Sequence, residues 1–200
     1  MSIKNVVFDF GGVLIDWNPR HLYENVFTDK SEMEFFLQNV CSFEWNLKQD
    51  AGRPLSEGTE ELQRQFPNYK REIDMYYKDW PKMLGGEIFE NTRLIKPLKA
   101  KYRLFGLSNW SKETYPIAYK KYPIFEQLEG IVLSGQERKI KPDKDIYNIL
   151  LKRYHLKASE SLFIDDNMAN VVAAIEIGFS GIHLGDGIRL EEKLINMGIL

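Results

Sequence analysis

The sequence predicts an α/β fold: a doubly wound parallel sheet with helices on both faces and a helical segment inserted after the first strand. Short apolar segments alternate with helix-spaced segments from about residue 91 onward, which is typical of parallel sheets. Near the N-terminus, Val6-Val7-Phe8 adds one more β-prone segment. Residues 20–80 contain no convincing strand and carry apolar side chains at helical spacing instead.

Length and composition are those of an ordinary globular protein. The 200 residues are 44% hydrophobic and 28% charged, which suits one large domain or one domain with an insertion. The net charge is -2 and the basic residues are dispersed, so no nucleic-acid or anionic-membrane surface is expected. No apolar run suits a signal peptide or a membrane span, so we expect a cytoplasmic protein.

The first strand is followed by the inserted segment. We expect a small helical bundle there, broken at Thr28-Asp29, Gly52-Arg53-Pro54 and Pro67-Asn68, where turn-forming residues gather. The expected division is a core domain of residues 1–15 and 86–200 and a cap domain of residues 16–85.

The rest of the chain alternates between helices and strands. Pro97 and Pro116 should kink or shorten the helices that contain them, and Gly178 should end another. The predicted helices are residues 91–101, 111–121, 143–154, 170–177 and 190–197, and the predicted strands are residues 103–107, 131–133, 161–164 and 181–184.

Asp9 ends the first predicted strand and precedes the glycine pair Gly11-Gly12. A buried strand that delivers a carboxylate onto a tight turn places it at the carboxyl edge of the sheet, where open α/β sheets bind ligands. The alternative is that Asp9 only caps a turn, and this segment alone leaves both interpretations open.

Three further polar groups follow predicted strands and are expected at the same edge. Taken singly, Ser108 could cap a helix and Lys141-Pro142-Asp143 could be an ordinary helix start. Adjacent carboxylates such as Asp165-Asp166 repel each other unless a cation or several N–H donors compensate. Together with Asp9, these make four polar groups in order, which are hard to attribute to coincidence. The three groups after Asp9 are Ser108-Asn109, Lys141-Pro142 and Asp165-Asp166.

These groups suit phosphoryl transfer. Asp9 and Asp166 offer the hard oxygen ligands that Mg²⁺ prefers. An aspartate can attack phosphorus and form an aspartyl phosphate, which splits hydrolysis into two steps. Ser108 and backbone N–H groups would hold phosphate oxygens, and the Lys141 ammonium would offset negative charge.

The four segments resemble the four motifs of the haloacid dehalogenase (HAD) superfamily, and the insertion resembles the C1 cap of its subfamily I. This resemblance spans nearly the whole chain and implies a Rossmann-like core. Within the superfamily the chain looks most similar to short bacterial α-D-glucose-1-phosphate phosphatases and also resembles the phosphatase domain of epoxide hydrolases. The matching segments are Asp9-Phe10-Gly11-Gly12-Val13-Leu14, Leu107-Ser108-Asn109, Lys141-Pro142-Asp143 and Phe163-Ile164-Asp165-Asp166-Asn167.

The resemblance implies a role for each matching residue. Asp9 would be the nucleophile, and Gly11 would contribute only its backbone carbonyl. The implied catalytic residues are Asp9 and Lys141, and the implied phosphate-binding residues are Ser108 and Asn109. The implied Mg²⁺ ligands are Asp9, Gly11 and Asp166, with Asp165 binding the ion either directly or through another ligand.

One position departs from the pattern. Most phosphatases of the superfamily carry a second aspartate two residues after the nucleophile, which protonates the leaving group, and here that residue is Gly11. Losing a general acid costs about 10²–10⁴-fold in rate. Three explanations are open: a leaving group that needs no acid, such as the anomeric oxygen of a sugar 1-phosphate; another acid, from the cap or Asp16; or a slow or inactive protein.

The cap should set substrate choice. Tryptophans beside Asn, Asp and Arg side chains suit a sugar, although burial of the tryptophans in the cap core is the simpler interpretation. Cys41 is expected to be a small core residue, and His21, His155 and His183 are expected to be structural. The cap residues considered are Asp16, Trp17, Asn18, Arg20, Trp45, Asp50 and Arg53.

The leading hypothesis is therefore a Mg²⁺-dependent phosphatase that acts on a small phosphorylated metabolite, such as a hexose 1-phosphate. A 2-haloacid dehalogenase, in which Asp9 attacks carbon without a metal, is the second hypothesis, and the Asp165-Asp166 pair argues against it. The third is a catalytically weak module that binds a phosphometabolite. The oligomeric state is left open.

Overall fold

Five parallel strands form the central sheet of the computed structural model, which describes residues 2–185 and 187–200. Their order is β5-β4-β1-β6-β7, so β1 is central and the chain winds outward in both directions. The predicted doubly wound parallel sheet is confirmed. The strands are β1 (Asn5–Phe8), β4 (Arg103–Ser108), β5 (Gly130–Leu133), β6 (Ser161–Asp165) and β7 (Ser180–His183).

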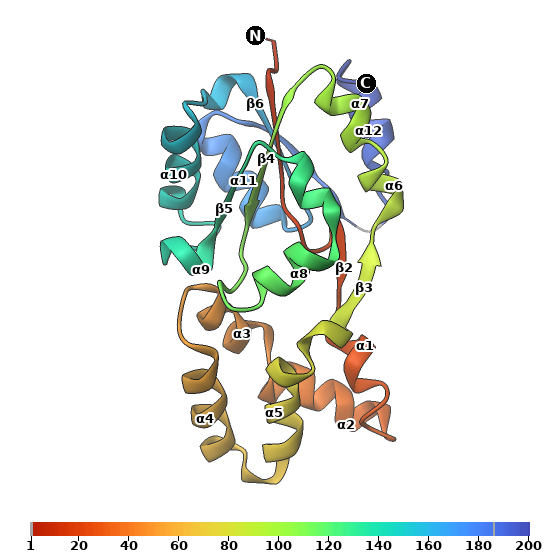
Figure 1. Ribbon diagram of the computed structural model, residues 1–200, viewed down its shortest axis with the longest axis vertical. Helices are drawn as coiled ribbons and strands as arrows, with labels where there is room; N and C mark the ends of the chain where they lie inside the picture. The colour runs from red at the N-terminus through yellow and green to blue at the C-terminus, as the bar shows by residue number, and fades with distance from the viewer. Residues whose placement is uncertain (1, 186) are drawn as a thin grey trace.

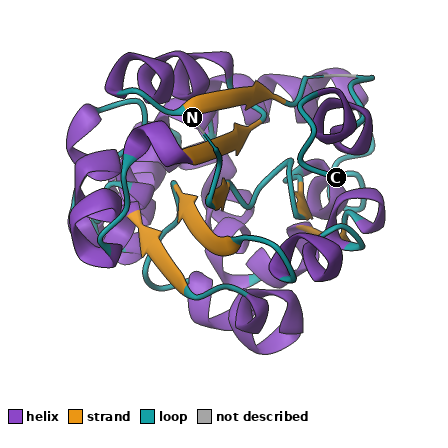
Figure 2. Cartoon of the chain, turned by 90° about the horizontal axis from the view of Figure 1, so that it is seen from above, coloured by secondary structure: helices purple, strands orange, loops and turns teal. Residues whose placement is uncertain are grey.

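Helices cover both faces of this sheet (Figure 2). Val7 packs into the hydrophobic cluster of the face that α10 and α11 cover, whereas Val6 and Phe8 pack into the cluster of the opposite face. Strand residues alternate between faces, and both faces are buried, which explains the uninterrupted apolar run. The covering helices are α10 (Lys144–Tyr154) and α11 (Met168–Ile177) on one face, and α7 (Ile95–Lys99), α8 (Tyr115–Lys121) and α12 (Leu190–Asn196) on the other.

Two predicted helices are shorter than expected. The helix predicted over 91–101 is divided into α6 (Phe89–Thr92) and α7, and Pro97 lies in the first turn of α7. The helix predicted over 111–121 begins only at Tyr115, with Pro116 in its first turn. Proline is tolerated in a first turn because its missing N–H has no partner there. The short helix α9 (Ser134–Glu137) was not predicted.

A two-stranded antiparallel ribbon, β2 (Ile15–Trp17) and β3 (Leu84–Glu87), connects the sheet to the inserted helices. Figure 1 shows the ribbon leading from the sheet, in the upper part, to the helices α1–α5 in the lower part. Neither strand was expected, because each is only three or four residues long. The proposed domain bounds at residues 15–16 and 85–86 fall within this ribbon, and the division itself stays a prediction.

The inserted segment is helical as predicted. Asp29 caps one helix by accepting from the Ser31 N–H at 2.8 Å, and Ser42 caps another by accepting from the Trp45 N–H at 3.2 Å. Cys41 is buried, as expected. The helices are α1 (Arg20–Tyr23), α2 (Lys30–Phe35), a π-helical turn (Phe36–Val40), α3 (Phe43–Asp50), α4 (Leu55–Gln65) and α5 (Lys70–Lys78), with 3₁₀ turns at Pro67–Tyr69 and Trp80–Met83.

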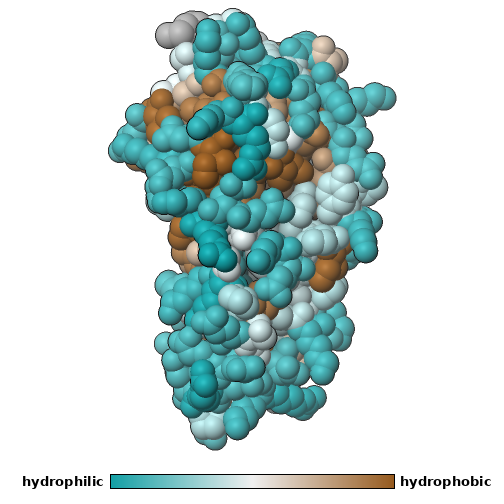
Figure 3. Space-filling view, turned by 60° about the vertical axis from the view of Figure 1, so that its left-hand side comes forward, coloured by the Kyte–Doolittle hydropathy of each residue, from teal (hydrophilic) through white to brown (hydrophobic). Residues whose placement is uncertain are grey.

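The surface differs between the two parts. On the face drawn in Figure 3, hydrophobic residues gather over the upper part, whereas the helical lower part is mainly hydrophilic. Exposed apolar side chains of α11 include Met168, Val172 and Ile175. Within residues 2–185 and 187–200, no helix has both the length and the apolar character to span a bilayer.

Candidate active site

Polar side chains from three neighbouring strands meet at the carboxyl edge of the sheet. Asp9 follows β1 directly, Ser108 is the last residue of β4, and Asp165 is the last residue of β6. Because β1 lies between β4 and β6, the three side chains leave adjacent strands at one edge. All three are buried, and the Asp9 N–H donates to the Ile164 carbonyl at 2.9 Å.

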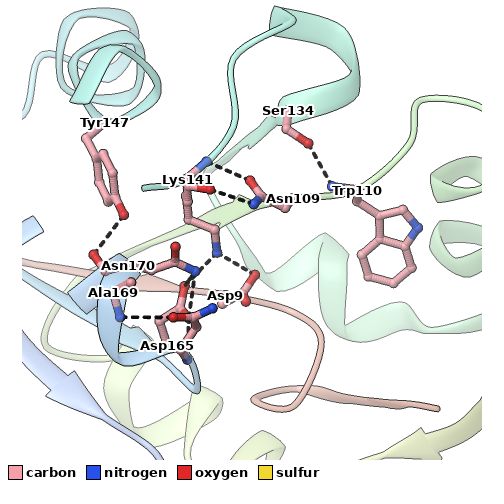
Figure 4. A network of polar contacts seen from close by, with 10 residues as sticks. Asp9, Asn109, Trp110, Ser134, Lys141, Tyr147, Asp165, Ala169 and Asn170 are labelled. Carbon is pink, nitrogen blue, oxygen red and sulfur yellow. Dashed lines mark hydrogen bonds and ion pairs between the residues drawn. The ribbon is translucent and has the colours of Figure 1, made fainter. Parts of the chain in front are cut away.

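Lys141 is buried among these carboxylates, with only 1% of its surface exposed. Its Nζ lies 2.9 Å from Asp9 Oδ1 and 2.6 Å from Asp165 Oδ2, and Figure 4 shows the side chain pointing between the two carboxylates. A buried ammonium stays charged only where anions compensate its desolvation. One cation is thus shared by two buried carboxylates.

Asn109 holds the backbone of Lys141. Asn109 Oδ1 accepts from the Lys141 N–H at 2.8 Å, and Asn109 Nδ2 donates to the Lys141 carbonyl at 3.0 Å (Figure 4). Asn109 was expected to bind phosphate, but both its amide oxygen and its amide nitrogen hold the backbone of Lys141. Asn109 also lines the cavity described below.

Asp165 is fully buried and its oxygens already have partners. Oδ1 accepts from the Asn167 N–H at 2.8 Å and from Asn170 Nδ2 at 3.0 Å, while Oδ2 faces Lys141. Tyr147 Oη donates to the Asn170 carbonyl at 2.8 Å. Sequence reasoning missed Asn170, and the signal was present: it is an isolated amide in the first turn of the largely apolar helix α11.

Gly12 leaves room for the Asp166 carboxylate. Gly12 has φ +69°, and a Cβ added there would overlap the Asp166 side chain. Asp166, unlike Asp9 and Asp165, is exposed, and each of the three offers one carboxylate oxygen within 4.8 Å of the others. The glycine that permits the turn thus also permits an acidic cluster beside it.

The acidic cluster carries more negative charge than Lys141 balances. Burial raises the pKa of Asp9 to about 7; the Lys141 ammonium opposes this rise and the Asp165 charge adds to it. Burial and the Asp165 charge also raise the pKa of Asp166. Asp9 Oδ1 is buried and accepts no well-directed hydrogen bond from the described residues. Carboxylate oxygens with excess negative charge fit Mg²⁺, the predicted ion.

A cavity of about 640 Å³ lies over this edge, and both parts of the molecule line it. The sheet side supplies the polar groups described above, and the helical side covers them with aromatic and aliphatic surface. Such a mixture of apolar walls and a few converging polar groups is typical of small-molecule sites. The helical side and its flanks contribute Trp17, Phe43, Asn46, Leu47, Asp50, Tyr77 and Trp80, and the sheet side adds Trp110 and Met168.

Some of the cap residues considered from the sequence line the cavity, and others do not. Trp17 and Asp50 line the cavity, whereas Trp45 is buried in the cap core and donates its indole N–H to the Gly58 carbonyl at 3.2 Å. Arg53 pairs with Glu61.

Asp16 is not among the residues that line the cavity, and its Oδ2 lies 2.9 Å from His21 Nε2. His155 follows α10 as its C-cap, and His183 Nε2 lies 3.0 Å from the Asp166 backbone carbonyl oxygen. The expectation that Asp16 supplies the missing proton is therefore not favoured by its position.

Gly11 leaves open space beside the nucleophile candidate. No heavy atom lies within 4 Å of a Cβ built at this position, whereas one built on Gly12 collides. The turn at Gly11 therefore has room for the side chain that most related phosphatases carry there, but offers no acid itself.

The arrangement as a whole can perform nucleophilic displacement. Asp9 lies in the cavity at the strand edge, beside a buried cation, and forms an acidic cluster with Asp165 and Asp166. Preorganised positive charge beside a nucleophile stabilises an anionic transition state. The Ser108 hydroxyl lines the same cavity.

Two characterised relatives are phosphatases by name. The chain is 28% identical over 205 residues to the sesquiterpene phosphatase astK of Aspergillus oryzae, covering 94% of this chain and 92% of the relative. It is 25% identical over 216 residues to a D-ribitol-5-phosphate phosphatase of Bacteroides thetaiotaomicron, covering 96% and 97%.

Solved structures with the same fold include both phosphate-binding and dehalogenating proteins. A HAD family enzyme from Bacteroides thetaiotaomicron, in complex with magnesium and inorganic phosphate, has a TM-score of 0.74 at 24% identity over 96% of this chain and 99% of that one. The L-2-haloacid dehalogenase from Xanthobacter autotrophicus, with chloropropionic acid covalently bound, has a TM-score of 0.67 at 18% identity over 99% and 84%. At these identities the likeness establishes the fold.

The family assignment rests on the match to a family model. The model of the haloacid dehalogenase-like hydrolase family matches residues 3–178, a span that includes all four motifs and the inserted helices. The chain therefore belongs to the haloacid dehalogenase-like hydrolases.

Proposed function

We propose that this protein is a Mg²⁺-dependent phosphatase that hydrolyses a small phosphorylated metabolite through an aspartyl-phosphate intermediate. The observation that carries the proposal is the cluster of Asp9, Asp165 and Asp166 beside the buried Lys141. Three carboxylates beside one ammonium leave excess negative charge, which a divalent ion would balance while it binds and polarises a phosphate. Both named relatives are phosphatases, which supports the same activity.

Each site residue then has a proposed role. Asp9 attacks phosphorus, and Lys141 holds the Asp9 carboxylate and offsets charge on the phosphoryl group. Asp166, Asp9 and the Gly11 carbonyl would hold the ion, while Asp165 orients Lys141. Ser108 donates its hydroxyl to a phosphate oxygen.

The substrate is proposed from the cavity. A hexose 1-phosphate fits the open position at Gly11, because its anomeric oxygen leaves more easily than an ordinary alkoxide. A second class, the phosphate of a larger apolar alcohol, is favoured by the aromatic walls of Trp17, Tyr77 and Trp80 and by the sesquiterpene phosphatase relative.

The two earlier alternatives make different demands on the site. A metal-free dehalogenase gains nothing from the extra carboxylates of Asp165 and Asp166, since they repel an anionic haloacid. The shared fold does not separate the two activities, because it hosts both. A binding module without turnover is supported only by the glycine at position 11.

Phosphate release separates these possibilities. Hexose 1-phosphates, hexose 6-phosphates and an isoprenoid alcohol phosphate are assayed with Mg²⁺ and with EDTA. We expect Mg²⁺-dependent release that Asp9→Asn abolishes. Turnover that survives in Asp9→Asn contradicts the aspartyl-phosphate route, and halide release from a 2-haloacid in EDTA supports the dehalogenase instead.

A further inference from the structure

A phosphatase built on this site needs a proton donor for any substrate whose leaving group is an ordinary alkoxide, such as the phosphate of an apolar alcohol. When Asp9 attacks the phosphorus of such a substrate, the departing alkoxide must be protonated, and Gly11 has no side chain to do so. Among the described residues that line the cavity, the carboxyl groups are those of Asp9, Asp50 and Asp166. Asp9 is the nucleophile and Asp166 a proposed metal ligand, so Asp50 is the carboxyl group without a role.

Asp50 lines the same cavity as Asp9, from the helical side. It is the last residue of α3, and its backbone carbonyl accepts at 2.5 Å from Oγ of Ser134, the first residue of α9 directly after β5. Ser134 Oγ in turn accepts from the Trp110 N–H at 2.9 Å. Asp50 is thus attached to the sheet edge that carries Asp9, although it comes from the inserted helices.

A chain of hydrogen bonds orients the Asp50 carboxyl group. Arg53 Nε donates to Gln49 Oε1 at 2.6 Å, and Gln49 Nε2 donates to Tyr77 Oη at 3.1 Å. Tyr77 Oη donates to Asn46 Oδ1 at 2.9 Å, which leaves Asn46 Nδ2 to donate to Asp50 Oδ2 at 2.9 Å. All donors point toward Asp50, and a carboxyl group held this way is preorganised.

We propose that Asp50 is the general acid and base of this phosphatase. In the first step Asp9 forms a bond to phosphorus, the phosphorus–oxygen ester bond breaks, and the Asp50 proton moves to the alcohol oxygen. In the second step Asp50 carboxylate takes a proton from water as the hydroxide attacks the aspartyl phosphate, releasing phosphate and restoring both residues. The role rests on the proposed function of Asp9.

The surroundings of Asp50 favour its protonated form. Burial raises the pKa of Asp50 to about 8; the Ser111 N–H opposes the rise and the Asp9 charge adds to it. Facing groups are Asp9 with its partner Lys141 from the sheet edge, and Tyr76 and Tyr77 from α5, whose own pKa values burial raises. Arg53, on the turn after α3, pairs with Glu61.

The test compares leaving groups in Asp50→Asn. An alkyl phosphate needs protonation as it leaves, whereas 4-nitrophenolate does not. With Mg²⁺, we expect Asp50→Asn to form the phosphoenzyme from an alkyl phosphate about 10²–10⁴-fold more slowly. With 4-nitrophenyl phosphate we expect a fast burst of nitrophenolate, one per enzyme, followed by slow turnover because the base for hydrolysis is missing. Equal slowing of the first step for both substrates overturns the proposal.

Two further variants control for folding and for the proposed function. Asp74→Asn removes an exposed carboxylate of the same helical part, which pairs with Lys78, and should leave both reactions unchanged. Asp9→Asn should abolish the burst itself. A wild-type protein without turnover refutes the proposed function, whereas a wild-type rate in Asp50→Asn for alkyl phosphates refutes the role of Asp50 alone.

A rescue variant uses the open space at Gly11. Because no atom lies within 4 Å of a Cβ there, Gly11→Asp can place a carboxyl group beside Asp9. In the Asp50→Asn background it should restore alkyl phosphate turnover by 10-fold or more, a small part of the usual general-acid effect of about 10²–10⁴-fold. If Gly11→Asp does not restore the alkyl phosphate turnover of Asp50→Asn, and if the first step slows equally for both leaving groups, Asp50 has a structural role.

Discussion

The two glycines of the pair Gly11-Gly12 are under different steric constraints. Gly12 has a positive φ of +69° and borders the Asp166 carboxylate, so it has no room for a side chain, whereas Gly11 is unobstructed. The carbonyl of Gly11, rather than its missing side chain, is the group proposed to bind metal.

This difference predicts opposite outcomes for two alanine variants. Gly12→Ala should displace Asp166 and strain the turn, so that the Mg²⁺-induced rise in thermal unfolding midpoint is lost. Gly11→Ala keeps the carbonyl and should retain that rise. Differential scanning fluorimetry with and without Mg²⁺ measures both, and equal behaviour of the two variants contradicts the geometry.

The raised pKa of Asp50 predicts a pH dependence of stability. Between the unfolded value of 3.8 and the folded value of about 8, the folded state holds a proton that the unfolded state has lost. Stability therefore falls as pH rises through this window, by at most about 1.4 kcal/mol per pH unit from this group. Asp50→Asn lacks this term, so its stability relative to wild type should rise from pH 4 to pH 8 in urea unfolding. A constant difference contradicts the raised pKa.

At the scale of elements, the turn after α3 is the place where the helical part meets the sheet edge. Ser134 Oγ joins Trp110 and Asp50 by two hydrogen bonds, and Glu113 Oε1 accepts from the Leu55 N–H at 3.1 Å. These contacts connect α3 and α4 to the loop after β4 and to α9, which follows β5. The position of Asp50 therefore depends on how these elements dock.

Ser134→Ala should weaken this docking. It leaves the buried Trp110 N–H without a partner, which costs about 1–3 kcal/mol of unfolding free energy, and it frees the end of α3. We expect slower turnover of alkyl phosphates along with the lower stability. Ser31→Ala, at an exposed helix start, is the control, and loss of stability without any loss of turnover contradicts the link between docking and Asp50.

At the scale of the whole molecule, the excess negative charge of the site predicts stabilisation by Mg²⁺. Binding to the folded state alone stabilises by about 2.7 kcal/mol at a free concentration of 100 Kd. The wild-type unfolding midpoint should rise with Mg²⁺ concentration, and Asp166→Asn should remove most of the rise. A rise of equal size in Asp166→Asn places the ion elsewhere.

The sequence alone determined the sheet and its polar edge. Val6, Val7 and Phe8 are apolar without interruption because both faces of a central parallel strand are buried, and strand ends follow from local signals such as the glycine pair. Asp9, Ser108, Lys141 and the two aspartates Asp165-Asp166 were therefore placed at one edge before any contact was known. Helix starts were predicted less well where Pro97 and Pro116 lie in first turns.

Only the tertiary structure decided which distant residues complete the site. Asp50 was one of several cap residues considered from the sequence, but it is separated from Asp9 by 41 positions, and no local pattern distinguishes it from the cap residues that lie outside the cavity. Asn109 and Asn170 hold Lys141 and Asp165 through contacts between different elements. The ribbon of β2 and β3 is too short for a periodic signal. These features depend on docking between elements, which propensity and periodicity do not encode, because both describe only neighbours along the chain.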